Sequence, residues 1–518
     1  MVKGKVIFMK RQRIKKALCV ALSAIMLFSM TGCGNENKEQ SGNVTLKWVF
    51  AGPGEQKDSK KVWAEFNKRI KEFPGLENVD VDIECINYPD FRQRIMLMQT
   101  GGESMDIIST YALDFAKEIE NKSLLPLDDL MKSENVDFVN ELPDWIIQMG
   151  QKDNVTYAIT SHQAMGSSDP GIIVPKKLFD KYADEEKIKK AFYNTPYYDE
   201  DNWQAVGELL QKMKDGGDLG LGYLSPKSIE TMYNGYDRVY GGFITKLDDE
   251  TGTLSYFADV PEYKTAIKYL NDWYKKGLIR QDILSVDTDA DKMGTNGYTV
   301  FQGGADAFGS RLREWKEKYG EEFSQILSRQ YTYILPTAAG GGLAISANCK
   351  HPEEAMRVID VLSSQKGKEL YNLMLYGIEG VQYEKISDDV IRLKDGAGAT
   401  SSDTYGQYHW VVGNSELRYE TEGEEGLKEH LYSLEKEGEN TKLSNFMGFI
   451  PDTSGFATEL LKVNSIKEEY APTLARGAVD DIDAYYNEFM DKLKLAGLDK
   501  IKEELQKQVN EFLANKKN

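Results

Sequence analysis

The amino-acid sequence predicts an α/β protein, and three observations lead to this fold class. Residues 44–50 and 79–86 alternate between apolar and polar side chains, as strands with one buried face do. Residues 106–110 form a short apolar segment of the kind found in buried strands. Segments with helical spacing of apolar residues lie between them, and the order strand, helix, strand, helix, strand favours a parallel sheet.

The first strand and the helices that follow it have clear apolar patterns. One face of the strand is expected in the core, and it consists of Val44, Leu46, Trp48 and Phe50. Residues 51–54 then form a turn that contains two glycines and a proline. The first helix is predicted from apolar residues at helical spacing, namely Val62, Phe66, Ile70 and Phe73. Residues 92–99 predict the second helix.

The middle of the chain, residues 171–330, holds helices and strands of its own. Residues 261–278 predict a helix, because apolar residues share one face and Gly277 follows as a C-cap. The residues on that face are Ala266, Leu270 and Trp273. Further strands are expected at residues 298–301, 331–336 and 343–346, followed by a helix at 352–363 that starts with proline. From Asp481 onward the chain is strongly helical and amphipathic.

The N-terminus has the features of a secretory signal. A basic segment is followed by an apolar run, residues 17–30, which is shorter than the roughly 20 residues that span a bilayer as a helix. The basic residues are Lys3, Lys5, Lys10, Arg11, Arg13, Lys15 and Lys16. Gly32 and Cys33 then resemble a bacterial lipobox, which implies that Cys33 carries the lipid anchor, including a palmitate-type acyl chain. Residues 1–32 are thus a lipoprotein signal peptide, and residues 33–43 a flexible tether.

Charge, size and cysteine content narrow the class of protein. Removal of residues 1–32 takes away seven basic groups and no acid, which lowers the net charge from −19 to −26. A surface this acidic disfavours nucleic acid as a partner. About 480 residues remain, enough for two or more domains. Only Cys85 and Cys349 are then left as thiols, and two separate buried thiols are preferred over one disulfide.

Several segments, in their order along the chain, resemble family 1 extracellular solute-binding proteins of the two-lobed kind. The first-lobe resemblance is carried by residues 92–103, 106–108, 124–130 and 351–356. Two later segments, residues 376–383 and 446–513, resemble the LplA-type lipoproteins of Gram-positive bacteria. Within the second of these, residues 469–477 and 495–500 are the most specific.

The resemblance implies a periplasmic-binding-protein-like fold of the class II type, with hinge strands near Gly171 and Tyr331 and a helical C-terminal extension. Lobe 1 is expected at residues 44–170 and 337–380, and lobe 2 at residues 171–336. Residues 381–518 would pack on the lobes, with the family's C-terminal domain at 446–513.

The same resemblance implies the receptor of an ABC importer, which captures a sugar or oligosaccharide by hinge closure and hands it to the permease subunits. Such a receptor is expected to be a monomer held by its lipid on the extracellular face of a Gram-positive cell membrane. It needs no cofactor. Two alternatives stay open: a receptor for a non-sugar solute such as a peptide, and a secreted glycan-degrading enzyme.

Motifs for catalysis or metal binding are weak in this sequence. No phosphate-binding P-loop, zinc-protease motif or nucleophile elbow occurs, which favours a binding protein over an enzyme. Asp287, Asp289 and Asp291 have the alternate spacing of a calcium loop, but Lys292 stands where such a loop needs glycine. A solvated acidic loop is therefore preferred, and no metal site is predicted. The glycines at residues 340–342 are interpreted as a turn.

Sugar binding needs aromatic rings for the apolar ring face and polar groups for the hydroxyls. In open α/β sheets ligands lie beyond the carboxyl ends of the strands. That rule selects Tyr88, Asp90, Tyr111, Asp114, Gln302 and Gly303, and the later loops add Glu379 and Trp410. The alternatives are ordinary loop aromatics for the two tyrosines, a turn cap for Glu379 and a core position for Trp410.

Overall fold

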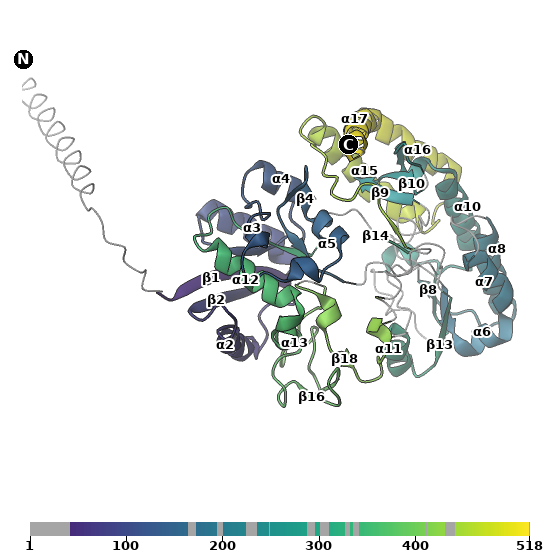
Figure 1. Ribbon diagram of the computed structural model, residues 1–518. Helices are drawn as coiled ribbons and strands as arrows, with labels where there is room; N and C mark the ends of the chain where they lie inside the picture. The colour runs from purple at the N-terminus through teal and green to yellow at the C-terminus, as the bar shows by residue number, and fades with distance from the viewer. Residues whose placement is uncertain are drawn as a thin grey trace, which may run out of the picture. The chain divides into compact units, whose positions relative to one another are not determined.

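The computed structural model confirms the parallel arrangement predicted near the N-terminus (Figure 1). Strand β1 (Val44–Gly52) lies between β2 (Val79–Asn87) and β3 (Ile107–Ser109) and pairs with both in parallel. Two further strands, β15 (Gly342–Ile345) and β6 (Ile159–Thr160), complete a five-stranded sheet in the order β2-β1-β3-β15-β6. Both pairings of β15 are antiparallel, so the sheet is mixed.

The structure describes residues 42–163, 172–193, 200–223, 236–247, 249–286, 296–300, 310–326, 332–334, 341–410, 412–429, 432 and 441–516. The chain divides into a small N-terminal unit, residues 1–43, and a larger unit, residues 44–518. All the helices and strands described here belong to the larger unit.

Helices cover both faces of the five-stranded sheet, so the second half of β1 is buried on both sides and not on one face only, as its alternation predicts. Trp48 is fully buried in the first core, together with residues of α2 (Ser59–Ile70), α12 (Pro352–Ser363) and α13 (Lys368–Tyr376). Val49 faces the opposite way and packs against α3 (Tyr88–Gly101). The predicted core face is confirmed for Leu46, Trp48 and Phe50, and the bounds predicted for α12 agree with the structure.

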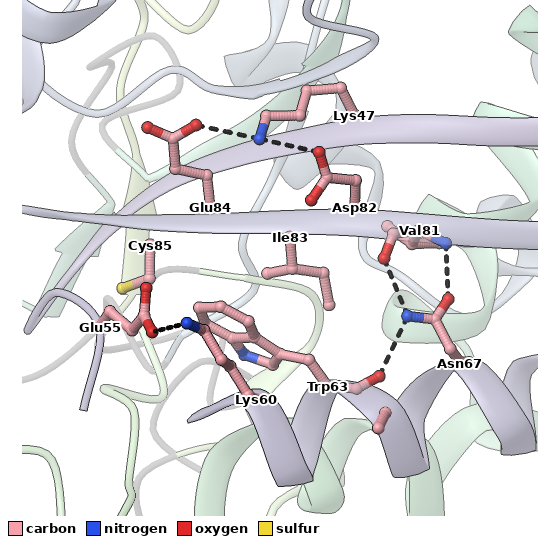
Figure 2. A pocket seen from close by; sticks show the side chains of 11 residues that line it. Lys47, Glu55, Lys60, Trp63, Asn67, Val81, Asp82, Ile83, Glu84 and Cys85 are labelled. Atoms are coloured by element: carbon pink, nitrogen blue, oxygen red, sulfur yellow. Dashed lines mark hydrogen bonds and ion pairs between the residues drawn. The ribbon is translucent and has the colours of Figure 1, made fainter. Parts of the chain in front are cut away.

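Strand β2 is an edge strand, and a side chain covers part of its free edge (Figure 2). Asn67 Oδ1 accepts a 2.5 Å hydrogen bond from the Val81 main-chain N–H, and Asn67 Nδ2 donates a 2.9 Å bond to the Val81 carbonyl. Nδ2 also donates to the Trp63 carbonyl at 3.0 Å. The amide thus occupies the place of a neighbouring strand, which protects an edge that would otherwise be open to pairing with another chain.

Replacement of Asn67 by alanine should lower the free energy of unfolding by about 1–3 kcal/mol, because it removes both partners of the Val81 main chain. Urea titration monitored by circular dichroism would measure the loss. Asn140→Ala is the matched control, since Asn140 is exposed and lies in a short 3-10 helix. Equal stability of the two variants would show that the Asn67 amide does not hold the edge.

Residues 172–326 contribute a second, separate core. Its four-stranded sheet has the order β13-β7-β12-β8, and a three-stranded sheet has the order β11-β10-β9. The strands are β7 (Ile172–Pro175), β8 (Gly222–Tyr223), β9 (Tyr236–Tyr240), β10 (Phe243–Lys246), β11 (Ser255–Tyr256), β12 (Tyr298–Val300) and β13 (Phe323–Ile326). The helices are α6 (Lys176–Tyr182), α7 (Glu185–Tyr193), α8 (Glu200–Asp215), α10 (Pro261–Lys275) and α11 (Ser310–Tyr319).

The helix predicted at residues 261–278 is confirmed as α10, which ends three residues earlier than predicted, at Lys275. Gly277 follows with a φ of 64°, a left-handed conformation that suits glycine at a helix end. The predicted buried face is confirmed, since Ala266, Leu270 and Trp273 are each no more than 3% exposed.

The C-terminal helices join this second core (Figure 1). They are α15 (Ala457–Leu474), α16 (Ile482–Leu495) and α17 (Leu498–Lys516). The last two confirm the helical pattern predicted from Asp481 onward, whereas α15 precedes it. The turn after α15 fits closely on α10, because a β-carbon on Gly477 would lie 2.3 Å from the Asn271 main-chain nitrogen. The Asn271 side chain donates to the Gly477 carbonyl at 2.8 Å, which fixes that contact.

A buried carboxylate ties β9 to the segment that leads into the C-terminal helices. Asp237 is 2% exposed and accepts a 2.5 Å hydrogen bond from Ser444 Oγ. Burial raises the pKa of Asp237 from 3.8 to about 7, although Ser444, the Asn445 N–H and the Lys516 charge oppose the shift.

This shift predicts that stability falls as the pH rises. The native state binds the Asp237 proton more tightly than the unfolded chain, so the contribution is fully present below about pH 4 and is lost as the pH rises through about 7. Across that window it amounts to at most about 4 kcal/mol. Asp237→Asn should therefore flatten the decline, as measured by urea unfolding at pH 4.5 and pH 8. A parallel decline in both proteins would contradict the assignment.

Short elements complete the described chain. They include α4 (Phe115–Glu120), α5 (Asp144–Met149), β4 (Gln151–Lys152), β5 (Val155–Thr156), β14 (Thr332–Ile334), β16 (Tyr383–Lys385), β17 (Val390–Leu393), β18 (Glu420–Thr421) and β19 (Thr441–Leu443). Cys85 and Cys349 are both free thiols, as preferred, with Cys85 buried and Cys349 partly exposed. Gly171 and Tyr331 lie outside the described residues, and the lobe boundaries stay predictions.

Candidate ligand-binding site

Four aromatic side chains from distant parts of the sequence meet at the carboxyl edge of the parallel strands. The Tyr88 ring stacks on the Trp410 ring at a centroid distance of 5.2 Å and an interplanar angle of 17°. Tyr111 lies 5.0 Å from Tyr88 and 5.5 Å from Trp410. Tyr408 completes the set at 5.6 Å from Tyr88. We refer to Tyr88, Tyr111, Tyr408 and Trp410 as the aromatic cluster.

The sheet accounts for the meeting of these rings. Tyr88 directly follows the end of β2, and Tyr111 lies two residues after the end of β3. Because β2, β1 and β3 are parallel, the residues that follow them gather at one edge. Trp410 reaches the same place from a later loop that packs on Gly341, where a β-carbon would lie 2.8 Å from the Trp410 carbonyl oxygen. The glycine segment expected as a turn therefore also permits this close approach.

The rings are half-buried, so parts of their faces can contact a ligand. The Tyr88 hydroxyl is buried and has no hydrogen-bond partner within the part of the chain that the structure describes. Burial raises the pKa of Tyr88 above its ordinary value, which keeps the hydroxyl neutral and able to donate. Flat rings beside an unused hydroxyl suit the C–H face and the rim hydroxyls of a sugar.

A cavity of about 560 Å³ is lined by residues that lie close in sequence to Tyr88 and Tyr111 of the aromatic cluster. Arg92, one turn after Tyr88 on α3, lines it together with Asp114 from the loop after Tyr111. The opposite wall comes from the hairpin of β9 and β10, including Tyr240. Burial raises the pKa of Tyr240, and the negative charge of Asp114 adds to the shift. Residues of α3 and of the segment after β3 thus line one space together with residues of the second core, and we call this space the hairpin cavity.

The structure therefore brings together part of the predicted set. Tyr88, Tyr111 and Trp410 meet in the aromatic cluster, whereas Asp114 lines the hairpin cavity and caps α4 by accepting from the Lys117 N–H. Asp90 is exposed in the first turn of α3.

Other predicted positions are elsewhere or outside the described chain. Glu379 is exposed, and its main chain bridges to Tyr383; no contact between described residues joins it to the aromatic cluster. Gln302 and Gly303 lie outside the described residues, as do the three aspartates of the calcium-like loop at 287–291.

Sequence reasoning missed several residues of this region. Tyr408 could have been found from its alternation with Trp410, because two aromatic residues two positions apart can share one face of an extended segment. Arg92 could have been found from its position one turn after Tyr88 on a predicted helix. The β9–β10 hairpin carries no local signal for a site, since only the three-dimensional fold places it opposite α3.

A groove of about 600 Å³ at the edge of β2 is a poorer candidate (Figure 2). Its charged side chains already pair with each other: Lys47 lies 3.0 Å from both Asp82 and Glu84, and Lys60 lies 3.2 Å from Glu55. A ligand would have to compete with these internal ion pairs. The described residues that line the groove come from β1, β2, α2 and the segment just before α2, and none belongs to the second core.

Two of the described histidines, His162 and His409, have buried ring nitrogens and fit a structural role. His162 is buried, and its Nδ1 lies 3.2 Å from Asn414 Oδ1. Burial lowers the pKa of His409 to about 3, which keeps that ring neutral at physiological pH. Among the described residues, no group of His, Cys, Asp or Glu side chains is arranged to hold a metal ion. None of the described helices has the length and apolar character needed to cross a bilayer.

This two-lobed, periplasmic-binding-protein-like α/β fold is shared with solved solute-binding proteins. The N-glycan transport solute-binding protein NgtS of Streptococcus pneumoniae matches with a TM-score of 0.74 at 22% identity, covering 91% of this chain and 100% of that one. An extracellular solute-binding protein of Bifidobacterium longum subsp. infantis matches with a TM-score of 0.60 at 14% identity, covering 92% of this chain and 99% of that one.

Sequence comparison gives the family. The model of the family described as bacterial extracellular solute-binding protein matches residues 54–369, and a domain of unknown function, DUF3502, matches residues 445–514. A carbohydrate ABC transporter substrate-binding protein of Streptococcus pneumoniae is 24% identical, over 98% of this chain and 99% of the relative. The chain belongs to the bacterial extracellular solute-binding protein family.

Proposed function

We propose that this protein captures an oligosaccharide outside the cell and delivers it to the permease subunits of an ABC importer, without chemical conversion. The observation that carries the proposal is the aromatic cluster, with its stacked Tyr88 and Trp410 rings and the unused Tyr88 hydroxyl at the carboxyl edge of the sheet. The names of the relatives support the same ligand class, since they include a carbohydrate transporter component and a glycan-transport protein.

Capture works by hinge closure in this proposal. A ligand that contacts the aromatic cluster and the β9–β10 hairpin together favours the closed arrangement, because it binds that arrangement more tightly than the open one. The lobes are those expected from the sequence, residues 44–170 with 337–380 and residues 171–336. The protein acts as a monomer of the LplA-type group, with its C-terminal region packed on the lobes.

Calorimetric titration of residues 34–518 against oligosaccharide and peptide panels tests the proposed function. The panel would include Man1GlcNAc and Man5GlcNAc, the glycans bound in the NgtS complexes. We expect saturable binding to at least one oligosaccharide, with the same oligosaccharide recovered unchanged by chromatography. Binding to peptides alone would contradict the sugar assignment, and the appearance of cleavage products would contradict the role as a receptor.

The proposal includes a lipid anchor at Cys33, which would hold the protein on the outer face of the membrane. Cys33→Ala should abolish incorporation of labelled palmitate and release the processed protein from the membrane fraction, or leave it as the uncleaved precursor. Cys19→Ala, which alters a thiol inside the signal peptide, is the control and should leave both readouts unchanged. Palmitate labelling that survives Cys33→Ala would contradict the anchor.

A further inference from the structure

The walls of the hairpin cavity differ in charge from the rest of the protein. Among the described residues that line it, Arg92, Arg238 and Lys467 are cationic and Asp114 alone is anionic. Asp114 is engaged as the N-cap of α4, where it accepts from the Lys117 N–H at 3.3 Å. The whole chain carries a net charge of −19, so a cavity with excess positive charge runs against the overall composition.

Two other cavities in the described structure show the opposite balance. The groove at the edge of β2 is lined by two lysines and three carboxylates, which pair internally. A cavity of about 810 Å³ beside α17 is lined by Lys152 and Lys516 against Asp153, Asp452 and Glu511. An excess of cations is therefore a specific property of the hairpin cavity in this comparison. Cavities lined by one sign of charge concentrate ligands of the opposite sign.

The cavity also has apolar walls. Phe257 and Phe243 line it, and Lys467 Nζ lies 5.5 Å from the centroid of the Phe257 ring. Arg92 is exposed on its helix, and Arg238 is half-buried on β9. A guanidinium presents parallel N–H donors that match the two oxygens of a carboxylate. Rings for a sugar's C–H face and guanidinium groups for a carboxylate are the two requirements of an acidic sugar residue.

Two residues that line the hairpin cavity lie close in sequence to members of the aromatic cluster. Arg92 follows Tyr88 by four positions on α3, which places both on one side of the helix. Ala112, which lines the cavity, directly follows Tyr111. One oligosaccharide could therefore stack on the rings with one unit and extend the next unit into the cavity.

We propose that the hairpin cavity is a subsite for a carboxylate-bearing sugar, such as a uronic or sialic acid unit, within the oligosaccharide that the aromatic cluster holds. This inference rests on the proposed function and names the ligand class more closely. Arg92 and Arg238 bind the carboxylate, and Lys467 adds positive charge at the same wall. Acidic oligosaccharides are then preferred over neutral ones of the same size and linkage.

The test compares acidic oligosaccharides with their carboxyl-reduced forms, in which each carboxylate becomes a hydroxymethyl group. Calorimetric titration of residues 34–518 with uronic-acid and sialic-acid oligosaccharides should give at least tenfold tighter binding for the acidic form of one pair. The preference should shrink at 0.5 M NaCl, since salt screens partly exposed charges. Arg92→Gln should reduce the affinity for the acidic form at least fivefold and leave the reduced form unaffected, and Arg238→Gln should act in the same direction.

Arg392→Gln is the matched control, because Arg392 pairs with Glu422 on a different part of the protein. Equal affinity for the acidic and reduced forms, or an Arg92→Gln variant that binds both as the wild type does, would overturn the acidic subsite while the oligosaccharide receptor stands. Preference for a sulfated or phosphorylated sugar over every carboxylated one would also overturn it. Failure to bind any oligosaccharide, acidic or neutral, would instead remove the proposed function itself.

Discussion

Replacement of Trp410 by alanine should weaken oligosaccharide binding by about 10- to 100-fold, or roughly 1.5–3 kcal/mol. The reason is geometric, because Trp410 stacks on Tyr88 and also contacts Tyr111 and Tyr408, so its removal opens the centre of the aromatic cluster. Tyr88→Ala should cost a similar amount, since it removes the same stacked pair from the other side. Calorimetry with the oligosaccharide that binds the wild-type protein most tightly would measure both effects.

Trp63→Ala provides the matched control for Trp410→Ala. Trp63 is also a half-buried tryptophan of the first core, but it lies on α2 in the groove at the edge of β2 (Figure 2). Its removal should lower stability and leave the affinity for the oligosaccharide within about twofold of the wild type, a difference of less than about 0.5 kcal/mol. If Trp63→Ala weakens binding as much as Trp410→Ala, the aromatic cluster is not the site.

Replacement of Asp360 by alanine should lower the free energy of unfolding by about 3–5 kcal/mol. Asp360 is 0% exposed on α12, and its Oδ1 accepts from the main-chain N–H groups of Asp137 at 2.7 Å and Phe138 at 2.9 Å. Its Oδ2 lies 2.5 Å from Lys366 Nζ. The alanine variant would leave two main-chain donors and a cation without this buried partner. Urea unfolding followed by circular dichroism would measure the loss.

Asp137→Ala tests whether burial is the reason for that large effect. The Asp137 carboxylate pairs with the same Lys366 at 2.8 Å, but its side chain is 54% exposed. Exposed ion pairs contribute little, so this variant should lose less than about 1 kcal/mol. A similar loss in Asp137→Ala and Asp360→Ala would show that the ion pair to Lys366, and not the buried main-chain hydrogen bonds, carries the stability.

Local patterns predicted much of the fold because single elements depend on nearby residues. The bounds of α12 agree with the prediction, since Pro352 marks the start and apolar spacing marks the buried face. The helix predicted at residues 92–99 is too short, because α3 starts at Tyr88 and accommodates Pro89 in its first turn. Residues 343–346 predicted strand β15, but no local signal predicted β6 or the antiparallel pairings of β15, because these depend on contacts between distant segments.

The candidate site was predictable only in part, and the reason is the distance along the chain. Tyr88 and Tyr111 follow parallel strands, so one rule about sheets placed them at the same edge. Trp410 was selected from a loop, but its stacking on Tyr88 joins residues more than three hundred positions apart. Periodicity describes neighbours within an element and cannot show such a contact.

A crystal structure of residues 34–518 with a bound oligosaccharide tests capture at the aromatic cluster most directly. We expect one sugar ring against Tyr88 and Trp410, and the ligand in contact with both the first core and the β9–β10 hairpin. An oligosaccharide bound in the groove at the edge of β2, or one that touches a single lobe only, would contradict capture by closure around these rings.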